Sequence, residues 1–82
     1  MPVLITVIRG TCQGDIHHVG DTFTCDWTTP DGMCLGAWNA LAPYVTALLC
    51  GGDVAWSEEK GVMRLHCVDP DGITLELRRV DR

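Results

Sequence analysis

The spacing of hydrophobic positions predicts a strand at the start of the chain. The segment 2–9, PVLITVIR, is apolar and rich in β-branched residues until Gly10 interrupts it, which is typical of a strand. Side chains alternate between the two faces of a strand, and here both sets are largely apolar. We therefore expect this strand to lie in the middle of a sheet.

A second, shorter strand is predicted at 22–27, where the sequence TFTCDW alternates. Phe23, Cys25 and Trp27 fall on one face, and polar residues fall on the other. This parity predicts that Cys25 is buried in the core. The TTPDG that follows is typical of a turn or of the entry to a helix.

Residues 33–52, MCLGAWNALAPYVTALLCGG, show hydrophobic positions at the spacing of a helix. Five side chains share one helical face: Cys34, Trp38, Leu41, Val45 and Leu48. Gly51 and Gly52 are expected to end the helix in a left-handed C-terminal cap. Pro43 lacks an amide donor, so we expect either a kinked helix or two short helices, the second beginning at Pro43.

Two further strands are predicted at 62–67 and 73–80, VMRLHC and ITLELRRV. The VDPDG between them is a strong reverse-turn signal. Ile73, Leu75 and Leu77 are expected to face the core. The element order β-β-α-β-β indicates an α+β fold, with a small antiparallel sheet and the helical segment packed on one face. A chain of 82 residues predicts a single domain, residues 1–82.

Composition and charge limit the classes of protein to which this chain can belong. Apolar residues make up 46% and charged residues 21% of the chain, a globular balance. The net charge of −5 argues against nucleic acid as the main partner, because phosphate contacts require clustered Lys and Arg. No apolar run reaches the length needed to span a bilayer, and the N-terminus is typical of a strand, not of a signal peptide. We therefore expect a cytoplasmic protein with no membrane partner.

The chain contains five cysteines, which is a high number for this length. A reducing cytoplasm disfavours disulfides, so metal-binding, catalytic and packing roles remain. Cys25 is assigned to the core, and Cys50, at the end of the helix, is expected to be buried. The other three cysteines lie at the ends of predicted elements: Cys12, Cys34 and Cys67.

Element ends are where side chains converge at one edge of a sheet. Cys12, Cys34 and Cys67 with His18 would supply the four thiolate and imidazole ligands that zinc or iron prefers. The spacing itself is a weak signal, because the chain has no CxxC pair. His17 and His18 are adjacent, so on an extended segment at most one of them faces the cysteines.

Two alternatives to a metal site remain open. Cys34 or Cys12 is the nucleophile of a small enzyme, with a histidine of the 17–18 pair as its base. The positive end of the helix dipole would favour the thiolate form of a cysteine at the helix start. The other alternative is a non-catalytic interaction module that forms a homodimer or another homo-oligomer.

Several segments together resemble a known group of proteins. GMCLGAWNAL, GGDVAW, HCVDPDG and ITLELRRV occur in this order, after Cys12 and the segment VGDTF. The pattern resembles a family of short prokaryotic proteins of uncharacterised function, and it spans about residue 10 to residue 80. The resemblance implies that Cys12, Cys34 and Cys67 belong to a shared pattern, whereas Cys25 and Cys50 do not.

The chain departs from the family pattern at two places. His66 stands where the family can carry a second cysteine, and Ile73 and Thr74 stand where a proline often occurs. The resemblance implies no particular activity. Of the three hypotheses we place first a thiol site that binds zinc or iron, with a cysteine-dependent enzyme and an interaction module as alternatives.

Overall fold

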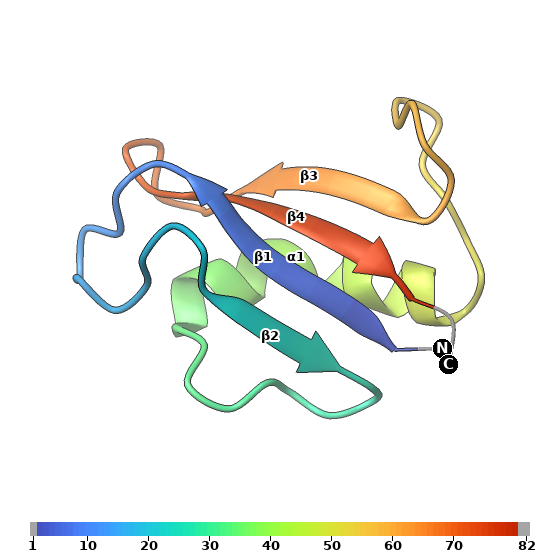
Figure 1. Ribbon diagram of the computed structural model, residues 1–82, viewed down its shortest axis with the longest axis horizontal. Helices are drawn as coiled ribbons and strands as arrows, with labels where there is room; N and C mark the ends of the chain where they lie inside the picture. Colours follow the sequence, from blue (N-terminus) through green and yellow to red (C-terminus); the bar gives the residue numbers. More distant parts are fainter. Residues whose placement is uncertain (1, 81–82) are drawn as a thin grey trace.

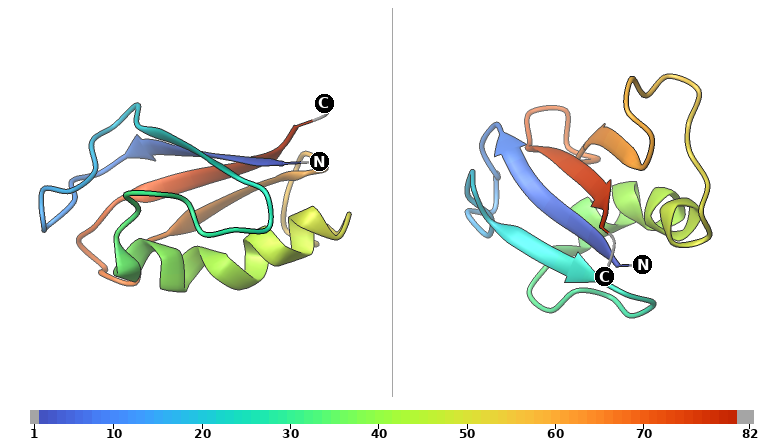
Figure 2. Two further views of the ribbon diagram at one scale, coloured as in Figure 1. Left: turned by 90° about the horizontal axis from the view of Figure 1, so that it is seen from below. Right: turned by 45° about the vertical axis from the view of Figure 1, so that its right-hand side comes forward.

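The computed structural model describes residues 2–80, which form one four-stranded antiparallel sheet and one helix (Figure 1). The elements are β1 Val3–Arg9, β2 Thr22–Cys25, α1 Leu35–Leu49, β3 Val62–His66 and β4 Thr74–Arg79. The strands lie in the order β2-β1-β4-β3, and α1 covers one face of the sheet (Figure 2). The predicted α+β fold, with its order of two strands, a helix and two strands, is confirmed.

β1 is a central strand, as its two apolar faces predict. It pairs antiparallel with β2 through Ile5 opposite Phe23, and with β4 through Ile5 opposite Leu77. The side chains on its helix-facing side are at most 1% exposed: Val3, Ile5 and Val7. Those on the opposite face are only partly buried, because α1 covers the other face.

The core lies between α1 and the sheet. The helix contributes Leu41, Val45 and Leu48, each at most 2% exposed. Equally buried side chains on the sheet side include Ile5, Met63, Ile73, Leu75 and Leu77. The expected inward set on β4 and the residue before it is therefore confirmed. Each such side chain stabilises the fold by about 1.5–3 kcal/mol when fully buried.

A single helix runs through Pro43, so the alternative of two short helices is wrong. Pro43 and Asn39, whose carbonyl loses its amide partner, are both exposed, so water can hydrate that carbonyl. The predicted C-terminal cap is present. Gly51 has φ +86°, and the N–H groups of Gly51 and Gly52 donate to the carbonyls of Leu48 (3.0 Å) and Ala47 (2.8 Å).

Two side chains differ from the sequence prediction. β2 ends at Cys25, and Trp27 takes φ +68° and is 64% exposed, so it does not continue the buried face of the strand. Cys50 is exposed, where burial was expected. Two residues along a helix correspond to a rotation of roughly 200°, so a side chain two positions after the buried Leu48 points away from the sheet. Cys25 is buried as predicted, at 2% exposed, and burial raises the pKa of its thiol.

One end of the sheet collects three segments that are distant in the sequence. β1 and β3 both run toward this end, where β4 begins: Arg9 and His66 are both register partners of Thr74. α1 also begins at this end, so the loop after β1, the start of the helix and the β3–β4 turn lie together (Figure 1). Within residues 2–80, no helix is long and apolar enough to cross a bilayer.

Candidate functional site

Cys12, Cys34 and Cys67 line one cavity at this end of the sheet, with a volume of about 180 Å³. Cys12 lies in the loop after β1, Cys34 immediately precedes α1, and Cys67 immediately follows β3. All three are free thiols and are partly buried. The three cysteines that occupy element ends in the sequence therefore share one cavity, and its remaining wall includes Ile16, Val68 and other short or apolar residues.

A side-chain hydrogen bond and a close backbone approach link the loop after β1 to the β3–β4 turn. The Gln13 side chain donates to the carbonyl of Asp71 at 2.8 Å. Gly10 lies so close to the turn that a Cβ on it would stand 2.6 Å from the carbonyl oxygen of Gly72, and its φ is +93°. Gly10 is therefore required by this approach, which brings the loop that carries Cys12 against the turn that follows Cys67.

Cys12 lies in a loop whose backbone amides lower the pKa of its thiol. The N–H of Asp15 donates to the carbonyl of Cys12 at 3.0 Å, and Asp15 takes the left-handed φ of +54°. Backbone hydrogen bonds from His17 and Ile16 are the main causes that lower the pKa of the Cys12 thiol. Burial opposes them, and the amides of Gly14 and Asp15 add to them. Successive amides around one atom stabilise an anion, so this loop favours the thiolate.

Cys34 is the N-cap of α1. Its sulfur accepts a hydrogen bond from the N–H of Ala37 at 3.4 Å. Ser, Thr, Asp and Asn are the strong N-cap residues, because an oxygen accepts this bond better than a thiol does. Capping alone is thus a weak explanation for a cysteine at this position, and its sulfur also lines the cavity.

Cys67 continues the sheet ladder by one residue, since its N–H donates to the carbonyl of Ile73 at 2.9 Å. A Cβ built on Gly36, in the first turn of α1, would stand 3.9 Å from the Cys67 sulfur and 3.5 Å from Val68. Gly36 therefore leaves open the space between the start of the helix and Cys67.

His17 connects two of the cysteines, and it was not the histidine that we placed in the site from the sequence. It is 3% exposed, and its ring packs edge-on against Phe23 with the centroids 5.2 Å apart. Its Nε2 accepts the backbone N–H of Cys34 at 2.9 Å, which requires the neutral ring with its proton on Nδ1. Its backbone amide is also the first cause of the lowered pKa of the Cys12 thiol.

His18 lies outside the lining of the cavity. Its ring is exposed and stands 3.0 Å from the carboxylate of Asp15, and its backbone N–H donates to Asp21 at 2.9 Å. The sequence contains no signal that chooses between the two adjacent histidines, because the choice depends on which face of the loop meets α1.

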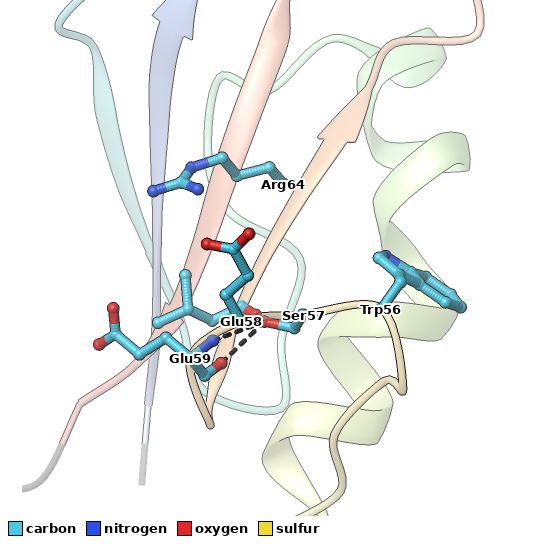
Figure 3. Close-up of a pocket in the computed structure, with 6 residues that line it drawn as sticks. Trp56, Ser57, Glu58, Glu59 and Arg64 are labelled. Carbon is cyan, nitrogen blue, oxygen red and sulfur yellow. Dashed lines mark hydrogen bonds between the residues drawn. The ribbon is translucent and has the colours of Figure 1, made fainter.

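A second hollow, of about 300 Å³, lies between the loop before β3 and the strand itself (Figure 3). Trp56 points away from the two glutamates in this view, and its ring packs edge-on against Tyr44 of α1. The Ser57 hydroxyl donates to the carbonyl of Glu59 at 2.7 Å, and the Glu59 carboxylate pairs with Arg78 at 2.8 Å. These interactions hold the loop against β4.

The metal-ligand role predicted for Cys12, His18, Cys34 and Cys67 stays a prediction. In the part of the chain that the structure describes, no three His, Cys, Asp or Glu side chains are grouped closely enough to hold a metal ion. The predicted homodimer likewise stays a prediction.

Comparison of the chain with known protein families, with curated proteins and with solved structures finds no match. The function must therefore be argued from the thiol cavity itself.

Replacement of His17 tests whether its ring holds the loop against the helix. We expect His17→Leu to lose about 1–3 kcal/mol of unfolding free energy, because the buried N–H of Cys34 would lose its acceptor. His17→Gln should lose less, since its amide oxygen can accept the same bond. Urea unfolding of both variants and of His18→Leu measures this. An equal effect at His17 and at the exposed His18 would contradict it.

Proposed function

We propose that this protein acts through a thiol site formed by Cys12, Cys34 and Cys67, and that it is a small cysteine-dependent enzyme with Cys12 as the nucleophile. The observation that supports the proposal is the convergence of the three thiols on one cavity. Packing alone is a poor explanation for these three cysteines. A buried packing cysteine such as Cys25 has a raised pKa, whereas the pKa of Cys12 is lowered.

The chemistry follows from the state of Cys12. A thiolate is the reactive form of cysteine, and its amide-lined loop favours that form without a neighbouring base. The unprotonated nitrogen of His17 is occupied by the N–H of Cys34, so we assign His17 to positioning. Cys34 and Cys67 supply a second and third soft group within the same cavity.

The rate of alkylation at each cysteine, followed by mass spectrometry of peptides, tests the assignment. We expect iodoacetamide to modify Cys12 faster than the other four cysteines at neutral pH. Its rate should fall with decreasing pH at a lower midpoint than in the urea-unfolded chain, where an ordinary thiol titrates at about 8.5. Because folding lowers the pKa of Cys12, its contribution to stability is present at high pH and is lost as the pH falls through the lowered value.

Two controls make this result interpretable. Cys12→Ser should remove the fast phase of alkylation, and Cys50→Ser should leave it unchanged. If all cysteines of the folded protein react alike, or if Cys12 follows the same pH profile folded and unfolded, the proposal is wrong.

Gly36→Ala tests whether the open space beside Cys67 matters for access. The new methyl group would make only ordinary contacts, at 3.5 Å to Val68 and 3.9 Å to the Cys67 sulfur. We expect a gain of up to about 1 kcal/mol in unfolding free energy, because alanine is the better helix former. The same variant should slow alkylation of Cys67. A stabilised variant with unchanged alkylation would show that this space is not the route to the thiols.

The second candidate function is the binding of zinc or iron by Cys12, Cys34 and Cys67, with His18 as the fourth ligand. It is supported by the same three soft donors around one cavity. The donors would have to close around the ion, since the described residues contain no preassembled group of ligands.

Titration of the reduced, chelator-treated protein with Zn²⁺ or with Co²⁺ as a spectroscopic probe tests this second candidate. One ion per chain should bind, and Cys12→Ser, Cys34→Ser and Cys67→Ser should each weaken binding. Cys50→Ser should bind as the unmodified chain does, and His18→Ala tests the fourth ligand. Binding that is insensitive to the three cysteines would exclude this candidate.

A further inference from the structure

Within residues 2–80, the lining of the cavity carries a formal negative charge and no formal positive charge. Asp69 is the charged side chain among these lining residues, and none of them is Lys or Arg. Its Oδ1 accepts the N–H of Asp71 at 3.0 Å. Among residues 2–80, neither Asp69 nor Asp71 is in an ion pair. Arg9 ends β1 at this end of the sheet, but it is exposed and does not line the cavity.

Apart from Asp69 and Gln13, the residues that line the cavity are glycines, cysteines and apolar residues. Ile73, at 1% exposed, is buried beneath the cavity. Ile16 and Val68 also line it, yet they are 53% and 62% exposed. Large apolar side chains at the rim of a concave site are typical of surfaces that a ligand covers.

We infer that the thiol cavity takes small, uncharged and largely apolar electrophiles and discriminates against anionic ones. This inference rests on the proposed function, since it names the substrate class of the same site. The volume of about 180 Å³ lies below the range of about 300–1,000 Å³ that is typical of drug-sized ligands. The cavity therefore fits a molecule of few atoms, or the reactive end of a longer apolar chain.

Two alkylating reagents of nearly equal size isolate the effect of charge. Iodoacetamide is neutral and iodoacetate is anionic. With either reagent the Cys12 thiolate forms a bond to the CH₂ carbon, and the C–I electron pair leaves with iodide. Cys50, exposed at the far end of α1, serves as the reference thiol within the same chain.

We expect the ratio of the iodoacetamide rate to the iodoacetate rate to be about 5-fold higher at Cys12 than at Cys50, the size expected for two unit charges about 4 Å apart in bulk water. Asp69→Asn should reduce this excess, because an asparagine oxygen can still accept the Asp71 N–H while the charge is removed. Asp26→Asn is the matched control, since Asp26 follows β2 at the opposite end of the sheet. Salt at 1 M should also reduce the excess.

A series of N-alkylmaleimides tests the apolar rim. The thiolate adds to one alkene carbon, and a proton from water is added to the other. We expect the rate at Cys12 to rise with each added methylene, by up to about 4-fold for full burial, and the rate at Cys50 to stay constant. Ile16→Ser should reduce this rise. Val19→Ser is the control, because Val19 is 59% exposed but does not line the cavity.

The outcomes separate this inference from the proposed function. Fast alkylation of Cys12 with no preference for charge or chain length would overturn the substrate class and leave the nucleophile in place. Slow alkylation of Cys12 by every reagent would overturn both. A preference at Cys12 that survives Asp69→Asn and high salt would show that charge does not select the ligand.

Discussion

The packing of α1 across one face of the sheet is the interaction on which the rest of the structure depends. Leu41, Val45 and Leu48 bury against side chains of β1, β3 and β4 that are almost inaccessible to solvent. Once this face is covered, the helix has one position on the sheet, and its first turn lies at the end where β1 and β3 finish. The position of Cys34 relative to Cys12 and Cys67 is thus a consequence of hydrophobic burial further along the helix, at Leu41, Val45 and Leu48.

A polar contact then completes the site. The buried ring of His17 accepts the Cys34 N–H, while the backbone amide of the same residue helps to lower the pKa of the Cys12 thiol. Buried polar groups that satisfy one another specify a geometry more narrowly than apolar packing does. His17 therefore links the loop that carries Cys12 to the start of α1, which carries Cys34.

The sequence predicted the fold well because its hydrophobic periods are regular. The period of two at Ile73, Leu75 and Leu77 follows directly from a strand that is covered on one face. The errors occurred where an element ends. By its position in the sequence Trp27 continues the alternation of β2, but the strand ends at Cys25 and Trp27 itself has a positive φ. Cys50 follows a buried helical stripe, but it is the C-cap of α1 and is exposed.

The sequence by itself determined the elements, the buried stripe of the helix, and which three cysteines stand at element ends, because these depend on local periodicity and turn chemistry. Only the tertiary structure decided that the three thiols share a cavity and that His17, not His18, supports it. Neighbouring residues in a loop have no intrinsic preference for one face. The choice depends on contacts between segments distant in the sequence, such as Gln13 with Asp71 and Gly10 with Gly72.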